Sequence, residues 1–298
     1  MTAADFRHLE IPQLATFEDG PGGLVRLKVT SPLANAEIYL HGAHVTHWQP
    51  AGAGPVLFMS AASVYAAGKP IRGGIPVIFP WFGPRAGHPG SPAHGFARTS
   101  VWEVESLVSP DERSVSVVLQ LISNEATRAL WPHDFVLRLR IDIGAQLVTA
   151  LEVENTSGET FQFEDALHTY LSVADVRAVG VTGLENTPYI DKTDGLLRKV
   201  QNETPIRITS ETDRVYLPTQ TTCTVHDPGL GRRLVVEKTG SETTVVWNPW
   251  IAKAKAMADF GDNEWPGMIC VETANAAEDA VTLPPGGKHT MVARVGVS

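Results

Sequence analysis

Phe135-Val-Leu-Arg-Leu-Arg-Ile-Asp-Ile143 alternates strictly along the chain, because every second residue is apolar and three of the four between them are charged. A period of two is typical of a β-strand that turns one face to a core and the other to solvent. We therefore predict a half-buried strand over residues 135–143. Such a strand needs antiparallel neighbours with the same pattern.

The neighbouring segments repeat the alternation. Apolar residues occupy every second position over 115–121, and Leu147, Leu151 and Val153 continue the pattern on the other side. Other β-rich runs are 24–30, 37–48, 160–173, 232–238, 243–247, 267–272 and 290–297. Clusters rich in Gly, Pro, Asn or Ser separate strands at 20–23, 155–158, 227–231 and 284–287, and such clusters are typical of turns.

Helical patterns are few. Residues 124–131 could form a short helix that Asn124 caps and Pro132 ends, and residues 252–260 could form another. Many short antiparallel strands with few short helices indicate an all-β protein. No linker composition interrupts the chain, so we predict that residues 1–298 form a single domain of two large, packed antiparallel sheets.

The composition restricts the partners. Of the 298 residues, 43% are hydrophobic and 19% are charged, and the formal net charge is -9. This acidic balance argues against nucleic acid and against an anionic membrane surface, whereas a few arginines could still bind a small anion. The first residues lack the pattern of a signal peptide, and no apolar run is long enough for a membrane helix. The chain has two cysteines, Cys223 and Cys270, and we expect reduced thiols and a cytoplasmic location. Separately, we expect the protein to be a monomer.

Two basic side chains lie four residues apart in His94-Gly-Phe-Ala-Arg98. If residues 93–100 are extended, both point to one face and lie about 13 Å apart at the backbone. That separation suits a ligand with a hydroxylated ring at one end and an anion at the other. A surface arginine beside a hydrogen-bonded histidine explains the spacing equally well. Arg72 precedes two glycines and offers a second guanidinium, although an arginine that covers a turn is the commoner case.

Three further polar residues are candidates for a site. His168 lies in an apolar run and has the pKa of a general acid, although buried histidines are more often structural. Glu272 ends another apolar run, so burial should raise its pKa and make it a better base, unless it serves a structural hydrogen bond. Asp191 lies in a predicted loop and could bind sugar hydroxyls.

The histidines at positions 41, 44 and 47 suggest a metal site at first sight. A strand over this segment would send His44 to the face opposite the other two, so the three could not bind one ion. No Gly-rich phosphate motif, nucleophile elbow or Cys-x-x-Cys pair occurs. We therefore expect no metal site.

Several segments together resemble the aldose 1-epimerase (mutarotase) superfamily, and within it the hexose-6-phosphate mutarotases. The resemblance covers most of the chain and lies, in order, in Lys69–Pro84, His94–Arg98, Ala166–Tyr170, Tyr189–Lys192, Trp247–Pro249 and Val271–Thr273. One position departs from the family, because Ala93 stands where members carry Gln before the His-Gly-Phe-Ala-Arg motif. One hydrogen bond to the substrate is then absent or supplied elsewhere, which bears on the sugar preference.

The resemblance implies a β-supersandwich of the galactose mutarotase type that acts without a cofactor. It implies that sugar binding and proton transfer are divided among six residues: His168 as general acid, Glu272 as general base, His94 at the ring oxygen, Asp191 at the hydroxyls, and Arg72 and Arg98 at the phosphate. The expected reaction interconverts the α and β anomers of a hexose 6-phosphate, glucose 6-phosphate first. Two alternatives stay open: a mutarotase for unphosphorylated aldoses, and a non-catalytic sandwich that binds carbohydrate.

Overall fold

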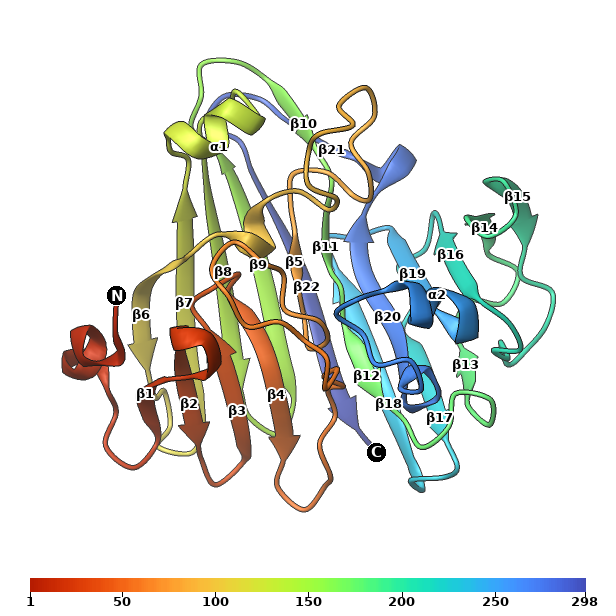
Figure 1. The fold of residues 1–298 in the computed structure, drawn as a ribbon, viewed down its shortest axis with the longest axis horizontal. Coiled ribbons are helices and arrows are strands. Elements are labelled where there is room, and N and C mark those ends of the chain that lie inside the picture. The colour runs from red at the N-terminus through yellow and green to blue at the C-terminus, as the bar shows by residue number, and fades with distance from the viewer.

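The computed structural model describes residues 1–298, and most of them lie in or between antiparallel strands (Figure 1). The first large sheet has eight strands in the order β13 (Gly180–Thr182), β17 (Cys223–Asp227), β18 (Arg232–Thr239), β22 (Lys288–Val297), β9 (Leu147–Asn155), β8 (Phe135–Ile143), β7 (Val115–Ile122) and β6 (Glu103–Val108). The second large sheet has the order β15 (Leu197–Val200), β14 (Pro188–Asp191), β16 (Thr212–Tyr216), β19 (Thr243–Asn248), β20 (Met268–Asn275), β11 (Asp165–Leu167) and β5 (Val77–Ile78), and β12 (Tyr170–Ser172) also pairs with β20. The two large antiparallel sheets of the all-β prediction are therefore present.

Two smaller sheets and a few helices complete the fold. A four-stranded sheet contains β1 (Ala15–Asp19), β2 (Val25–Thr30), β3 (Ala34–Tyr39) and β4 (His44–Pro50), and a two-stranded sheet pairs β10 (Phe161–Phe163) with β21 (Val281–Leu283). The α-helices are α1 (Glu125–Leu130) and α2 (Trp250–Ala256), and the 3-10 segments are Ala3–Leu9, Pro21–Gly23, Ala97–Thr99, Trp265–Gly267 and Ala277–Asp279. None of the helices is long and apolar enough to cross a membrane.

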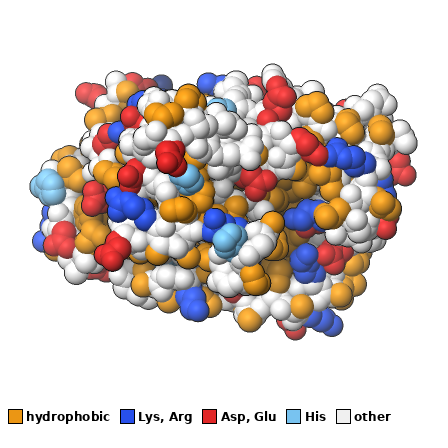
Figure 2. All heavy atoms as spheres, turned by 90° about the horizontal axis from the view of Figure 1, so that it is seen from above, with side chains coloured by type: hydrophobic (Ala, Val, Ile, Leu, Met, Phe, Trp, Pro, Cys, Tyr) orange, Lys and Arg blue, Asp and Glu red, His pale blue; other side chains and the backbone are white.

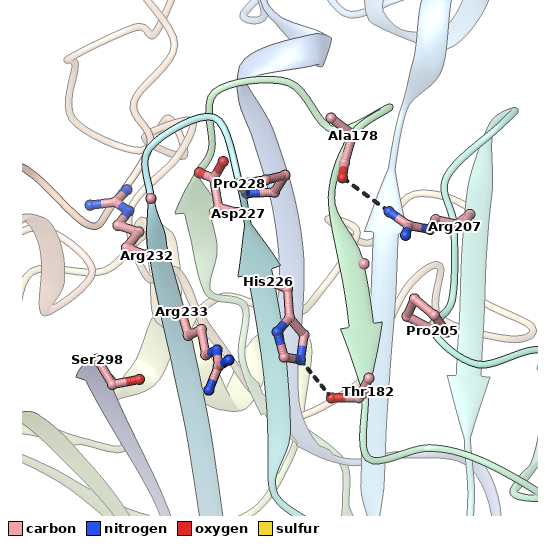
Figure 3. A pocket seen from close by; sticks show the side chains of 12 residues that line it. Ala178, Thr182, Pro205, Arg207, His226, Asp227, Pro228, Arg232, Arg233 and Ser298 are labelled. Atoms are coloured by element: carbon pink, nitrogen blue, oxygen red, sulfur yellow. Dashed lines mark hydrogen bonds between the residues drawn. The ribbon is translucent and has the colours of Figure 1, made fainter.

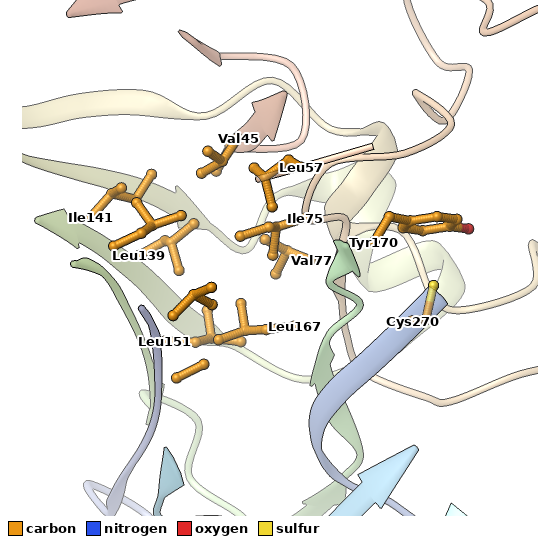
Figure 4. Packing of buried hydrophobic residues seen from close by; sticks show 14 of the residues in the cluster. Val45, Leu57, Ile75, Val77, Leu139, Ile141, Leu151, Leu167, Tyr170 and Cys270 are labelled. Atoms are coloured by element: carbon orange, nitrogen blue, oxygen red, sulfur yellow. The ribbon is translucent and has the colours of Figure 1, made fainter. Parts of the chain in front are cut away.

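The core lies between the sheets. The alternation predicted over residues 135–143 is that of β8, whose apolar side chains are all buried while the residues between them are half-buried or exposed. A single cluster of 66 buried apolar residues takes side chains from both large sheets and from β4. Figure 4 shows side chains of β8 and β9 close to those of β4, β5 and β11: Leu139, Ile141 and Leu151 near Val45, Val77 and Leu167. Apolar surface buried on this scale is the main term that stabilises the fold.

Two predicted runs are broken into shorter strands. Residues 37–48 contain the end of β3, a tight turn, and the start of β4, because Gly42 (φ 75°) and Ala43 (φ 48°) reverse the chain. The backbone of Arg98 approaches Gly42 so closely that a Cβ there would lie 2.6 Å from the Arg98 carbonyl oxygen. Residues 160–173 likewise form three strands, β10, β11 and β12, rather than one.

The helix predictions were partly right. Asn124 caps α1 by accepting a hydrogen bond from the Thr127 amide at 3.0 Å, as predicted. The second helix spans Trp250–Ala256 and not 252–260, because the chain leaves the helix at Met257 in an extended conformation. The segment 93–100 is not extended either, since His94 (φ 65°) and Gly95 (φ 70°) turn the chain into the 3-10 segment Ala97–Thr99.

Candidate active site

The structure brings His168 and Glu272 together, although 104 positions separate them in the sequence (272 minus 168). The start of strand β20 pairs with β12 and its end pairs with β11. His168 lies in the break between those two short strands. Its Nε2 lies 3.3 Å from Oε1 of Glu272. Glu272 is 1% exposed and His168 is 8% exposed, so both members of the pair are buried.

Burial moves the two pKa values in opposite directions. It raises the pKa of Glu272 well above the usual value, and the nearby charge of Asp213 raises it further. It lowers the pKa of His168 well below the usual value, and the charges of Arg72 and Arg98 lower it further. Nδ1 of His168 and Oε2 of Glu272 are buried and have no hydrogen-bond partner. Buried polar atoms without a partner are uncommon, and a polar ligand bound at this pair would supply the missing hydrogen bonds.

His94 lies on a tight turn beside His168. Its imidazole ring is 5.9 Å from that of His168 and stands edge-on to Phe82 at 5.1 Å, measured between centroids. Nδ1 of His94 accepts a hydrogen bond from the Gly83 amide at 3.2 Å, so in the neutral ring the proton is on Nε2, which can donate to a ligand. Burial and the charge of Arg98 keep the His94 pKa well below its usual value. Gly95 makes the turn possible, because a Cβ there would lie 1.8 Å from the Phe79 carbonyl oxygen.

Arg72 reaches the pair through Tyr170. Its Nη1 donates to the Tyr170 hydroxyl at 3.0 Å, and the Tyr170 ring stacks on the His168 ring with centroids 4.7 Å apart and planes 12° from parallel. Its Nε and Nη2 donate to Oδ2 of Asp259 at 3.2 and 3.0 Å. Burial opposes the charge of Arg72, but Tyr170 and Asp259 outweigh burial, so its pKa is raised. Gly73 and Gly74, which follow Arg72, lie close to the backbone of Phe58 and Val45, where a Cβ would clash.

Arg98 is the less well partnered of the two arginines. Its Nη2 donates to the Ala93 carbonyl at 2.8 Å, and its buried Nε has no partner. Burial and the neighbouring charge of Arg72 lower the pKa of Arg98 to about 10. Two guanidinium groups that repel each other in a largely buried place would be stabilised by an anion between them.

Asp191 is not brought into this group. Its Oδ1 accepts hydrogen bonds from the amide and hydroxyl of Thr193, and its Oδ2 lies 2.8 Å from Nζ of Lys199. The residue ends β14 rather than lying in a loop. Lys192 follows it in a turn, with its Nζ 3.5 Å from Oδ2 of Asp213, and its charge acts on Glu272 and His168.

Sequence reasoning missed Asp213, Lys192, Tyr170 and Asp259. The sequence around Asp213 in β16 contains no signal that distinguishes it from other acidic strand residues. Lys192 follows β14 in a turn, so no strand alternation in the sequence predicts where its side chain lies.

The residues of the segment 247–250 have different roles: one borders the site, and the others make structural contacts. Trp247 stands edge-on to His168 at 5.9 Å between centroids and forms one wall of the site. Asn248 donates to the carbonyls of Trp265 and Met268, and Trp250 packs on Trp265 with centroids 4.2 Å apart. Only the first of these residues therefore contacts the acid–base pair.

A metal could in principle use three side chains here. His168, Cys270 and Glu272 place ligand atoms within 4.8 Å of one another, and all three are buried. The cationic side chains of Arg72, Arg98 and Lys192 act on the same place, and they oppose a bound cation. The two buried histidines of the 41–47 segment bind backbone instead, at the Lys69 and Gly73 carbonyls, so they do not face one ion.

A hollow of about 680 Å³ lies elsewhere, at the β13–β17–β18 edge of the first large sheet (Figure 3). Two of its three arginines bind the protein itself: Arg207 donates to the Ala178 carbonyl, and Arg232 donates to the Pro55 and Ser172 carbonyls. His226 shares a 3.2 Å hydrogen bond with Thr182. The hollow contains no buried acid–base pair. The face in Figure 2 shows basic and acidic side chains interspersed rather than one large patch of either sign.

Comparison with known proteins places these residues in a family. The family model described as aldose 1-epimerase matches residues 26–295. The chain belongs to the aldose 1-epimerase family. Among curated relatives of this epimerase, a candidate glucose-6-phosphate 1-epimerase of Cenchrus ciliaris is 39% identical over 259 residues, which cover 84% of this chain and 78% of the relative. A candidate glucose-6-phosphate 1-epimerase of Escherichia coli K12 is 37% identical over 250 residues, covering 84% and 83%.

Solved structures agree with this assignment of the epimerase. A candidate mutarotase from Salmonella typhimurium superposes with a TM-score of 0.90 at 31% identity, covering 97% of this chain and 95% of that one. A galactose mutarotase related enzyme from Lactobacillus acidophilus has a TM-score of 0.73 at 16% identity, with 92% and 97% covered, and shows the fold alone. The predicted galactose mutarotase-like fold and the predicted family are thus confirmed.

Proposed function

We propose that this epimerase interconverts the α and β anomers of a hexose 6-phosphate, with glucose 6-phosphate as the first candidate. The observation that supports it most is the buried His168–Glu272 pair, 3.3 Å apart, with Arg72 joined to it through Tyr170 and with the charge of Arg98 acting on His168. An acid and a base are what ring opening at C1 needs, and the guanidinium groups are suited to a remote phosphate.

The proton steps balance without a co-reactant. Glu272 takes the proton of the C1 hydroxyl while His168 donates one to the ring oxygen, so that the bond from C1 to the ring oxygen breaks and an aldehyde forms. Rotation about C1–C2 turns the other face of the aldehyde to the C5 hydroxyl. The ring closes as His168 removes the proton from that hydroxyl and Glu272 returns one to the new C1 oxygen.

The phosphate has a part in these steps besides binding. In the free protein, Arg72 and Arg98 hold down the pKa of His168, which must be protonated to act as the acid. A phosphate dianion between the two guanidinium groups offsets their charge and lets the pKa of His168 rise. Binding of the phosphorylated sugar and charging of the acid are then one event, and the remote group raises the rate as well as the affinity.

Two residues would hold the sugar ring. The Nε2–H of His94 is free to donate to the ring oxygen or a neighbouring hydroxyl. For the hydroxyls, Asp213 is a better candidate than Asp191, because Asp191 would have to give up Thr193 and Lys199 to reach a ligand. The charge of Asp213 raises the pKa of Glu272, so Asp213 lies close to the proposed base.

Anomer exchange measured by NMR on glucose 6-phosphate and on galactose tests this function. We expect wild-type protein to accelerate exchange of glucose 6-phosphate, and Arg72→Ala and Arg98→Ala to lower kcat/KM for it. The slower galactose exchange should not fall in these variants and should rise somewhat, because loss of a guanidinium charge lets the pKa of His168 rise. Faster turnover of galactose would favour the mutarotase for unphosphorylated sugars. No acceleration with either sugar would favour the non-catalytic sandwich.

A further inference from the structure

Lys192 occupies a fixed place at the edge of the candidate active site. Its backbone amide donates to the Asp213 carbonyl at 2.9 Å, so the residue is anchored just beyond β14 against β16. Its Nζ lies 3.5 Å from Oδ2 of Asp213 and 5.1 Å from the centroid of the Phe82 ring. The Phe82 amide in turn donates to Glu164 at 2.8 Å, so the aromatic wall is itself held in place.

The Lys192 ammonium group lies among the ionisable side chains of the candidate active site. On β16 and β20 it faces Asp213 and Glu272, and its charge also acts on His94 and His168. Lys253 of α2 also acts on Asp213, but its Nζ is paired with Glu211 at 3.1 Å. Asp213 is 8% exposed and Glu272 1% exposed, so two carboxylates share a poorly hydrated place.

We propose that Lys192 is a positioning residue of this site, whose ammonium group holds the Asp213 carboxylate toward the sugar and favours the negatively charged form of the neighbouring base Glu272. Two carboxylates near each other in low dielectric do not both ionise unless a cation compensates them. Asp213 makes ionisation of Glu272 harder and Lys192 makes it easier. This inference rests on the proposed function, in which Glu272 must be ionised to accept a proton.

The sign of the effect is determined by the charges. Loss of Lys192 leaves Asp213 without its ion pair and raises the pKa of Glu272 further, so the base is ionised only at higher pH. The acidic limb of the kcat/KM profile, which reports the free base, then moves to higher pH. The same loss raises the pKa of His168, since Lys192 also opposes its charge, so the basic limb shifts in the same direction.

The experiment compares pH profiles of glucose 6-phosphate anomer exchange for wild type, Lys192→Met, Lys192→Arg and Lys199→Met. Lys199 is a matched control, because it is the lysine of the adjoining strand β15 whose Nζ pairs with Asp191 and Asp194 instead. For Lys192→Met we expect the acidic limb to move up by about one pH unit, the size expected of one charge across a partly buried site. We expect kcat/KM to fall by up to about tenfold at pH 6 and by less at pH 9.

Lys192→Arg should keep the acidic limb near its wild-type position, and Lys199→Met should keep the whole profile. A folded Lys192→Met protein with an unmoved acidic limb, or with the same rate loss at every pH, overturns the proposal. So does a Lys199→Met profile that shifts as far as that of Lys192→Met, because the effect would then be one of overall charge.

A second measurement is independent of turnover. Proteins labelled with ¹³C at the glutamate carboxyl group report the titration of Glu272 by NMR, with Glu272→Gln identifying the signal. A higher titration midpoint in Lys192→Met supports the inference even if the wild type proves inactive on glucose 6-phosphate, in which case only the proposed function fails. An unchanged midpoint contradicts the inference whatever the activity.

Discussion

At the scale of single residues, the pair His168 and Glu272 owes its chemistry to burial. Glu272→Gln keeps the shape of the side chain and removes the base, so we expect kcat for anomer exchange to fall by about a hundred- to ten-thousandfold with a small change in KM. The melting temperature should stay equal or rise, because the buried, partly unpartnered carboxyl group is lost. NMR exchange and thermal melts measure both, and a variant within twofold of wild-type kcat would remove Glu272 from the mechanism.

The charges of Arg72 and Arg98 give a second prediction at this scale. Because they lower the pKa of His168, glucose without a phosphate should show a lower kcat and not merely a higher KM. The basic limb of kcat should also lie at lower pH for glucose than for glucose 6-phosphate, since only the latter carries the compensating dianion. Inorganic phosphate added at millimolar concentration should partly restore kcat on glucose. Equal kcat values for the two sugars would show that the phosphate contributes binding alone.

At the scale of elements, a turn rather than a strand presents His94. Gly95→Ala places a Cβ at positive φ and 1.8 Å from the Phe79 carbonyl oxygen, so the turn must move. We expect a loss of about 2–4 kcal/mol in unfolding free energy by urea denaturation, together with a loss of activity. Gly90→Ala in the preceding loop is the control, because its Cβ would meet nothing within 4 Å. Similar stabilities for the two variants would mean that the turn can adapt.

At the scale of the whole molecule, Asp165 belongs to a hydrogen-bonded chain that runs through Asn275 and links the two large sheets. Its Oδ1 accepts a hydrogen bond from Asn275 at 2.8 Å, and Asn275 also contacts His289 of β22 in the first large sheet at 3.1 Å. Burial raises the pKa of Asp165 to about 7, and its Oδ2 has no partner. The folded protein therefore binds a proton that the unfolded chain releases. This contribution to stability is complete below about pH 4 and is lost as the pH rises to about 7.

Asp165→Asn should remove this dependence while keeping the hydrogen bond from Asn275. Between pH 5 and pH 8, we expect the unfolding free energy of the wild type to fall by about 2–3 kcal/mol more than that of the variant. Denaturant titrations at the two pH values measure the difference. Parallel behaviour of the two proteins would mean that Asp165 is ionised throughout.

The expectation that the whole protein is a monomer stays a prediction that sedimentation can test.

Local alternation along residues 115–153 was sufficient to predict strands β7, β8 and β9, because a sheet with one buried face imposes its period directly on the sequence. The residues His168, Glu272, Arg72, His94 and Arg98 could also be chosen from the sequence, since their motifs occur in a recognisable order. The proximity of the first two was not visible there, because it depends on which strands pair with β20.

Tertiary structure alone decided which of two adjacent residues lies at the site and how the charged groups act on one another. Asp191 and Lys192 are adjacent in sequence, yet the pairing of β14 with β16 turns the lysine toward Asp213 and leaves the aspartate to Lys199. The opposite pKa shifts of His168 and Glu272 likewise arise from burial and from arginines distant in sequence. Sequence patterns report which face of a strand is buried, whereas electrostatics depends on distances across strands that only the folded chain defines.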